Sequence, residues 1–171
     1  MPLESSYAFR LVSPADEALA EIMKGLMEEY ASLYGDYFSR HAVPEQTEWY
    51  LPPQGGFIVL EKAGQILAMG GFKRYDAQTA EFKRIWVRSD LRQQGLAGEI
   101  LSELERLAAK AGYSQIYLTT GFRQRGATRL YLRHGFHALH DLSGDLERYS
   151  LPPYDGRLGF RKAIDPLEVN S

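Results

Sequence analysis

The chain has 171 residues, a formal net charge of -2, 44% hydrophobic and 25% charged residues, and no cysteine. This composition is ordinary for one globular domain with a substantial core; it argues against a general nucleic-acid-binding protein, which is usually strongly basic, and excludes disulfides and zinc–thiolate sites. No stretch approaches the roughly 20 apolar residues of a membrane span, and the start, Met-Pro-Leu-Glu-Ser-Ser, lacks the features of a signal peptide, so we expect a cytoplasmic protein that does not bind membranes.

The first predicted elements are a strand over Tyr7–Val12 and a helix that follows it. Ser13 is predicted to cap this helix, with Pro14 in its first position and Asp16 reaching back in a capping box. The helix is indicated by an apolar stripe at Leu19, Ile22, Met23, Leu26, Met27 and Tyr30. Residues 31–54 are predicted to be irregular or weakly helical.

Three strands are predicted next. Phe57–Glu61 and Ile66–Phe72 form a hairpin through residues 62–65, and a turn over Tyr75–Gln78 leads into a strand that ends at Val87. Near the end of the chain, Leu158–Ile164 is predicted to close the sheet. We find no repeat or linker, so we expect a single domain over residues 1–171 with a flexible tail from 165 to 171.

A loop with small residues, Arg92–Ala97, separates the strand Phe82–Val87 from the next predicted helix, which ends at Gly112. The helix is indicated by apolar residues at Ile100, Leu101, Leu104, Leu107, Ala108 and Ala111. Such a loop presents unpaired N–H groups and the positive end of the helix dipole, which suit a pyrophosphate. Neither G-x-G-x-x-G nor G-x-x-x-x-G-K-[ST] is present, so the sequence does not support a Rossmann or a P-loop nucleotide site.

A second segment has the same layout: a strand over Ser114–Thr120 precedes a helical stretch that starts at Gln124. The two segments resemble the signature blocks of the GCN5-related N-acetyltransferase (GNAT) superfamily. Residues 92–97 fit (Q/R)-x-x-G-x-(G/A), and the second block, N-x-x-A-x-x-x-Y-x-x-x-G-F, is matched at Ala127, Tyr131, Gly135 and Phe136. Gln124 stands where Asn is usual; it keeps an amide that can hydrogen-bond the pantetheine arm, on a longer side chain. The resemblance covers about residues 80–136.

The resemblance implies an α/β fold with a mixed, mostly antiparallel central sheet and helices on both faces, and acetyl-CoA as co-substrate without a metal. In that fold two strands diverge, and their backbone groups pair with pantetheine; here these groups belong to residues 85–87 and 118–120. The implied cofactor contacts are Ile85, Trp86, Val87, Arg92, Gln93, Gln94, Gly95, Leu96, Ala97, Gln124 and Ala127. Six arginines lie near the two blocks, and we assign a phosphate contact only to Arg92 or Arg125.

Acetyl transfer needs a base for the amine and an acid for the departing thiolate. The resemblance makes Glu81 the base candidate and Tyr131 the acid candidate. A regular strand would place Glu81, Lys83, Ile85 and Val87 on one face. The structural alternatives are a surface Glu81 paired with Lys83 or Arg84, and a core tyrosine at position 131.

The acceptor is less clearly indicated. Residues 31–55 and their flanks are rich in aromatic side chains, and Tyr30, Tyr34 and Tyr154 are candidates to line an amine site, through cation–π contacts or beside nearby carboxylates. Equally, these rings could roof the core. The histidines, His41, His134, His137 and His140, match no common zinc motif.

We expect a small-molecule amine as acceptor. A CoA-binding sensor without turnover and a protein or peptide N-acetyltransferase remain alternatives, and whether the chain forms a homodimer stays open.

Overall fold

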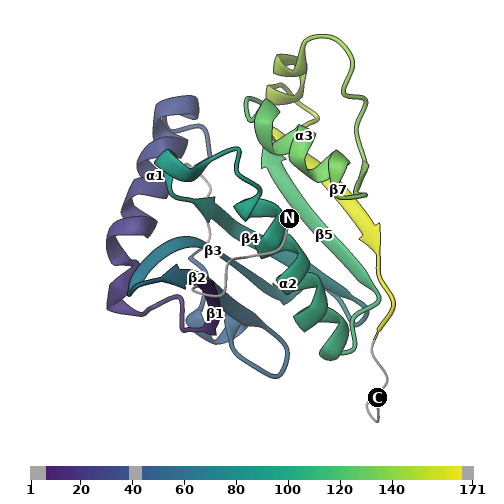
Figure 1. The fold of residues 1–171 in the computed structure, drawn as a ribbon. Helices are drawn as coiled ribbons and strands as arrows, with labels where there is room; N and C mark the ends of the chain where they lie inside the picture. The colour runs from purple at the N-terminus through teal and green to yellow at the C-terminus, as the bar shows by residue number, and fades with distance from the viewer. Residues whose placement is uncertain (1–6, 39–43, 167–171) are drawn as a thin grey trace.

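The computed structural model describes residues 7–38 and 44–166. They form a seven-stranded sheet in the order β1-β2-β3-β4-β5-β7-β6, flanked by helices (Figure 1). Only β4 and β5 are parallel neighbours; the other neighbouring pairs are antiparallel. The predicted mixed, mostly antiparallel α/β fold is therefore confirmed.

The strands are β1 (Tyr7–Leu11), β2 (Gly56–Lys62), β3 (Gln65–Arg74), β4 (Thr79–Val87), β5 (Gln115–Gly121), β6 (His137–Ala138) and β7 (Arg157–Ala163). The α-helices are α1 (Ala20–Tyr34), α2 (Leu96–Lys110) and α3 (Arg125–Arg133). Short 3-10 helices are η1 (Glu17–Leu19), η3 (Thr47–Tyr50), η4 (Ser89–Leu91) and η5 (Leu146–Ser150). The predicted hairpin, the strand ending at Val87 and the two strand–loop–helix segments are confirmed to within a few residues.

The predicted start of the first helix is wrong. The Ser13 hydroxyl accepts a hydrogen bond from the N–H of Ala15 in a local turn, and Asp16 itself caps η1 by accepting from the N–H of Ala18. Short polar side chains that bond two residues ahead favour turns over helix, so α1 begins only at Ala20. The predicted flexible tail lies outside the described residues from position 167 onward.

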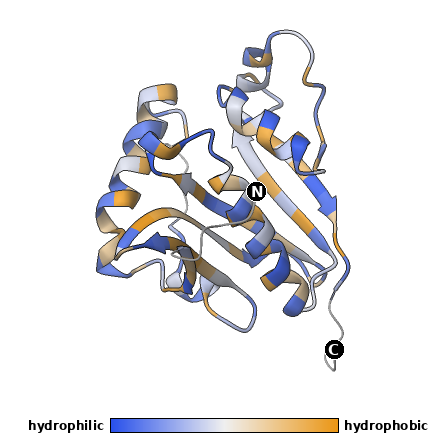
Figure 2. Cartoon of the chain, in the orientation of Figure 1, coloured by the Kyte–Doolittle hydropathy of each residue, from blue (hydrophilic) through white to orange (hydrophobic). Residues whose placement is uncertain are grey.

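The sheet has an apolar core on each face. On one face, α2 inserts fully buried side chains, among them Ile100, Leu101 and Leu104, against Ile58 and Leu60 of β2. On the other face, Phe57, Val59 and Met69 pack with Tyr50, η1 and the first half of α1. Figure 2 shows apolar residues along the strands and hydrophilic residues in the loop leading into α2.

A β-bulge interrupts β4 beneath α2. Gly70 of β3 lies opposite two residues, Arg84 and Ile85, because the register shifts between the flanking pairs, Gly71–Lys83 and Met69–Trp86. Arg84 adopts a φ of 60°, in the left-handed region that costs a non-glycine residue energy.

This bulge corrects the predicted faces of β4. Arg84 lies on the same side as Lys83, since both contact Glu45, whereas Ile85 packs with Phe82 in the core under α2. The prediction that Glu81, Lys83, Ile85 and Val87 share one face is therefore wrong: the extra residue reverses the alternation after Lys83.

Gly70→Ala is expected to lower the free energy of unfolding by about 1–3 kcal/mol, the usual cost of overpacking a tight core. A methyl group at this position would lie 2.8 Å from side-chain atoms of both Ile85 and Ile100. Gly25→Ala is the matched control, because nothing lies within 4 Å of its added methyl and it is an exposed helix position; it should stabilise by about 0.5–1 kcal/mol. Urea unfolding measures both, and equal effects would contradict the packing argument.

Candidate active site

The parallel strands β4 and β5 pair over only three residues. The ladder joins Glu81 to Tyr117 as its last pair, although β4 continues to Val87 and β5 to Gly121. Beyond this point β4 stays paired with β3, and β5 with β7. The facing edges of β4 and β5 thus carry backbone groups without a ladder partner, and the predicted cofactor positions 85–87 lie along this opening.

The loop entering α2 forms a nest of backbone donors. Gln93 and Gly95 adopt positive φ angles of 65° and 85°, and Gly95 is the N-cap without a side-chain capping bond. The first helix bond is donated by Glu99 to the carbonyl of Gly95. Within the described residues, none of the N–H groups from 93 to 98 has a hydrogen-bond acceptor. This arrangement can bind an anion.

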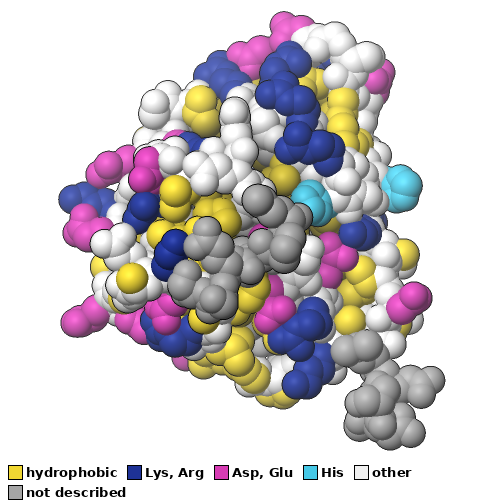
Figure 3. Space-filling view, viewed as in Figure 1, with side chains coloured by type: hydrophobic (Ala, Val, Ile, Leu, Met, Phe, Trp, Pro, Cys, Tyr) yellow, Lys and Arg dark blue, Asp and Glu magenta, His cyan; other side chains and the backbone are white. Residues whose placement is uncertain are grey.

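Arg92 holds this loop against α1. Its guanidinium donates to the carboxylate of Glu29 at 2.9 Å and to the carbonyl of Val87 at 3.2 Å. Arg125, in the first turn of α3, is exposed and has no ionic or hydrogen-bond partner among the residues that the structure describes. It belongs to a row with Arg129 and Arg133, and Figure 3 shows basic side chains over α3. Of the two arginines predicted to contact phosphate, Arg125 is the one with an unengaged guanidinium.

Gln124 organises the turn between β5 and α3. Its Oε1 accepts hydrogen bonds from the N–H of Gly121 at 2.8 Å and from the hydroxyl of Thr120 at 3.1 Å. Its amide NH₂ has no partner within the described residues. The longer side chain at this position therefore leaves two donors for a ligand while its oxygen closes the turn, and Ala127 sits half-buried one turn along α3.

Tyr131 lies in α3, with its ring packed against Phe136 and Phe160 at centroid distances of 5.9 and 5.6 Å. The residue is 7% exposed. Its hydroxyl has no hydrogen-bond partner among the described residues. Every fully buried side-chain oxygen or nitrogen of those residues does have a partner, so the hydroxyl of Tyr131 has some exposure to solvent. Burial raises the pKa of Tyr131, so the phenol keeps its proton.

Glu81 lies at the point where β4 and β5 part. Its side chain is 13% exposed and its carboxylate is 3.6 Å from the ammonium of Lys73 on β3. Lys83 and Arg84 instead contact Glu45, at 3.0 Å each. The alternative of a surface Glu81 paired with Lys83 or Arg84 is therefore wrong.

The three tyrosines predicted to line the acceptor site fall into two groups. The rings of Tyr30 and Tyr34 are 5.6 Å apart, in an aromatic cluster that includes Phe122. Tyr154 instead meets Tyr149 edge-to-face, with ring centroids 4.8 Å apart. Burial raises the pKa of Tyr34 to about 12, and its hydroxyl accepts the N–H of Arg123.

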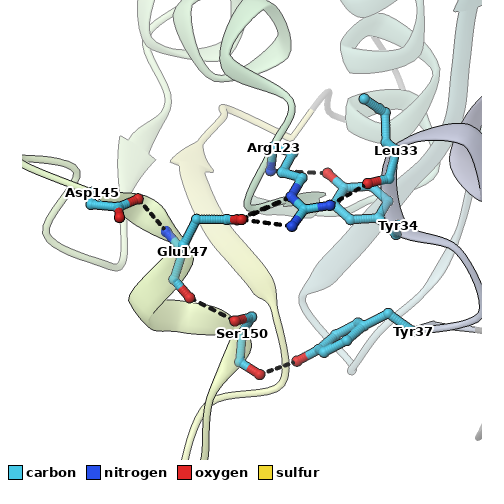
Figure 4. Close-up of polar contacts among 7 residues, drawn as sticks. All are labelled: Leu33, Tyr34, Tyr37, Arg123, Asp145, Glu147 and Ser150. Atoms are coloured by element: carbon cyan, nitrogen blue, oxygen red, sulfur yellow. Dashed lines mark hydrogen bonds and ion pairs between the residues drawn. The ribbon is translucent and has the colours of Figure 1, made fainter.

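Arg123 fastens α1 to η5 (Figure 4). Its guanidinium donates to the carbonyl of Leu33 and to the carboxylate of Glu147, both at 2.6 Å. Tyr37 adds a hydrogen bond from its hydroxyl to the carbonyl of Ser150 at 2.8 Å. Through Tyr34 and Arg123, these contacts tie the end of α1 to the turn after β5 and to η5.

Sequence reasoning missed two features of the site. Glu45 had no motif to mark it, and the contact between α2 and α3, where His134 lies against Gly98, depends on tertiary packing. Among the described residues no group of three or more His, Cys, Asp or Glu side chains is arranged to hold a metal; His41 lies outside them. No helix in the described ranges is long and apolar enough to cross a membrane.

Curated relatives match part of this chain in sequence. The curated N-acetyltransferase 8 of Rattus norvegicus is 34% identical over 96 residues, and that of Homo sapiens is 33% identical. The matched region is 53% of this chain but only 43% and 42% of those proteins, so the chain spans less than half the length of these relatives.

Solved structures share the fold. A putative acyl-CoA N-acyltransferase from Klebsiella pneumoniae has a TM-score of 0.69 at 18% identity, covering 94% of this chain and 99% of that one. A putative acetyltransferase from Salmonella typhimurium, solved with its cofactor acetyl-CoA, has a TM-score of 0.64 at 18% identity, covering 95% and 96%. The acetyltransferase (GNAT) family profile matches residues 23–136, well over half of the chain. The chain therefore belongs to the GNAT family of acetyltransferases.

Proposed function

We propose that this protein transfers the acetyl group of acetyl-CoA to a primary amine of a small molecule by direct attack. The observation that carries the proposal is the opening between β4 and β5, which runs from Glu81 to the unpaired N–H groups at the start of α2. An extended pantetheine arm would add to the free strand edges as a short strand, with its pyrophosphate on the α2 nest.

In the proposed reaction, the amine nitrogen attacks the thioester carbonyl carbon and the carbon–sulfur bond breaks. Glu81 accepts a proton from the ammonium form of the acceptor, which frees the amine to attack. Tyr131 donates its proton to the departing sulfur and takes up the proton that the nitrogen loses as the amide forms. The products are an N-acetyl amide and CoA thiol, and Glu81 then loses its proton to solvent. Burial raises the pKa of Tyr131, which keeps the phenol protonated but makes it a weaker acid, so the donor role rests on the position of Tyr131 in the second signature block and not on its pKa.

Thiol release from acetyl-CoA, measured across a panel of small amines and short peptides, tests the proposal. We expect release that depends on a small amine and an equal yield of N-acetylated product by mass spectrometry. Acetyl-CoA binding without turnover on any acceptor would favour the sensor alternative, and turnover on peptides alone would favour a peptide N-acetyltransferase.

Glu81→Gln is expected to lower kcat/KM by about 100-fold at neutral pH and below, the low end of a general-base contribution. The loss should shrink as the pH approaches the pKa of the amine, because the free amine then needs no base. Glu61→Gln is a matched control, a strand glutamate that pairs with Arg10 instead. A loss that stays constant across the pH profile would assign Glu81 a structural role.

A further inference from the structure

A cluster of charged side chains borders the opening on the side of the sheet opposite α2. At its centre, the carboxylate of Glu45 accepts a hydrogen bond of 2.8 Å from the hydroxyl of Tyr50. Lys83 and Arg84 each approach it to 3.0 Å, and Lys73 lies at 3.8 Å. One carboxylate is thus held by three cations and a phenol, which is a complete carboxylate-binding site filled by the protein's own side chain.

The binding groups are only partly shielded from solvent: the side chains of Lys83 and Arg84 are 34% and 33% exposed. Tyr50 is 1% exposed, and the Lys73 side chain is 20% exposed, so charge is screened less here than at an open surface. Burial by itself would raise the pKa of Glu45, but hydrogen bonds from Tyr50 and Lys83 outweigh it and hold that pKa below its usual value.

The cations of the cluster exceed its carboxylates. Glu45 and Glu81 together face Lys73, Lys83 and Arg84. Without Glu45, the three cations of the cluster would be left with one carboxylate, Glu81, which contacts only Lys73, and a second anion would be needed to balance them. The strained φ of Arg84 at the bulge is what directs its side chain to this side of the sheet.

The same cluster contacts the proposed base. The ammonium of Lys73 lies within 4 Å of both carboxylates, Glu45 and Glu81. A ligand group that replaced Glu45 would therefore be held a short distance from the group that accepts the proton of the amine.

We infer that the acceptor is an amine that carries a carboxylate, as an α-amino acid does, and that this carboxylate takes the place of Glu45 on Lys83, Arg84 and Tyr50. The inference rests on the proposed acetyl transfer and names its substrate class. The amine then lies toward Glu81. A cavity of about 360 Å³, lined by Glu48, Trp49, Gln54, Lys73 and Arg74, adjoins the cluster through Lys73 and offers room for the rest of the acceptor.

Matched acceptor pairs test this inference: L-phenylalanine against 2-phenylethylamine, and L-leucine against 3-methylbutylamine, each assayed by thiol release with the full chain. We expect the amino acid to be the better substrate of each pair. Lys83→Met should lower kcat/KM for the amino acids by about 10-fold or more, the scale of one charge-assisted hydrogen bond, and change that for the plain amines by less than about 2-fold.

Two further variants separate carboxylate recognition from a structural role. Glu45→Gln removes the competing charge and should lower KM for the amino acids while leaving KM for the plain amines unchanged. Arg10→Met removes an arginine on β1 that pairs with Glu61 outside the cluster and should affect neither class.

Turnover of the plain amines at equal or higher kcat/KM, or an equal loss for both classes in Lys83→Met, would overturn the inference and leave the proposed acetyl transfer standing. No turnover with any member of the pairs would also overturn the inference. Thiol release with the wider amine panel would then show whether the chain transfers acetyl groups to another acceptor.

Discussion

Tyr131→Phe is expected to lower kcat about 100-fold, the low end of a general-acid contribution, with acetyl-CoA affinity unchanged. The substitution removes one hydroxyl and keeps the ring that packs on Phe136 and Phe160. Because the hydroxyl has no partner among the described residues, its loss should change the free energy of unfolding by less than about 0.5 kcal/mol. Steady-state kinetics on an accepted amine and urea unfolding measure the two quantities.

Tyr113→Phe is the matched control for this variant. Tyr113 is as buried as Tyr131, but its hydroxyl donates to the carbonyl of Gln54 at 2.6 Å. Its removal should cost about 1 kcal/mol of stability and leave kcat unchanged. The two tyrosines thus predict opposite signatures. If Tyr131→Phe turns over normally on a good amine, Tyr131 is a packing residue and the acid assignment fails.

Gly95→Glu is expected to weaken acetyl-CoA binding at least about tenfold, or 1.4 kcal/mol. Gly95 caps α2 with a φ of 85°, and a carboxylate there would meet the proposed pyrophosphate with both bulk and like charge. Nothing lies within 4 Å of an added methyl in the structure itself, so the fold should survive, at the strain cost of a non-glycine residue in this conformation. Calorimetric titration with acetyl-CoA measures the change.

Gly112→Glu controls for that strain. Gly112, just after the other end of α2, has a φ of 98° and equally open surroundings. It should lose comparable stability and bind acetyl-CoA as the unaltered chain does. If both variants lose acetyl-CoA affinity equally, or if neither loses any, the pyrophosphate does not bind at the start of α2.

The sequence predicted elements whose signals are local. The apolar residues of α2 recur at helical spacing, and most of them are buried in the structure. Ala63 and Gly64, with φ angles of 53° and 78°, make the tight turn of the predicted hairpin. The small residues Gly95 and Ala97 likewise indicated a helix start with accessible N–H groups, because no large side chain at these positions covers the backbone.

The sequence did not predict features that depend on tertiary contacts. A bulge at Arg84 has no glycine to mark it, and one extra residue reversed every later side chain of β4. Except for Tyr50, the residues that contact Glu45 are about 30 or more positions away in the sequence. No periodic pattern in the sequence predicts contacts between residues so far apart. A phosphate contact was predicted for Arg92 or Arg125, and the sequence could not decide between them, because the partner that engages Arg92, Glu29 of α1, lies 63 residues away.

In the proposed complex, acetyl-CoA occupies the opening between β4 and β5 with its pyrophosphate at the start of α2. Amide hydrogen exchange, followed by mass spectrometry with and without acetyl-CoA, is the decisive experiment, because this mode of binding gives named backbone groups new hydrogen bonds. We predict slower exchange in residues 85–98 and 118–124, and unchanged exchange in β1 and β2. Saturating acetyl-CoA that protects other segments and leaves residues 93–98 unchanged would contradict this mode of binding.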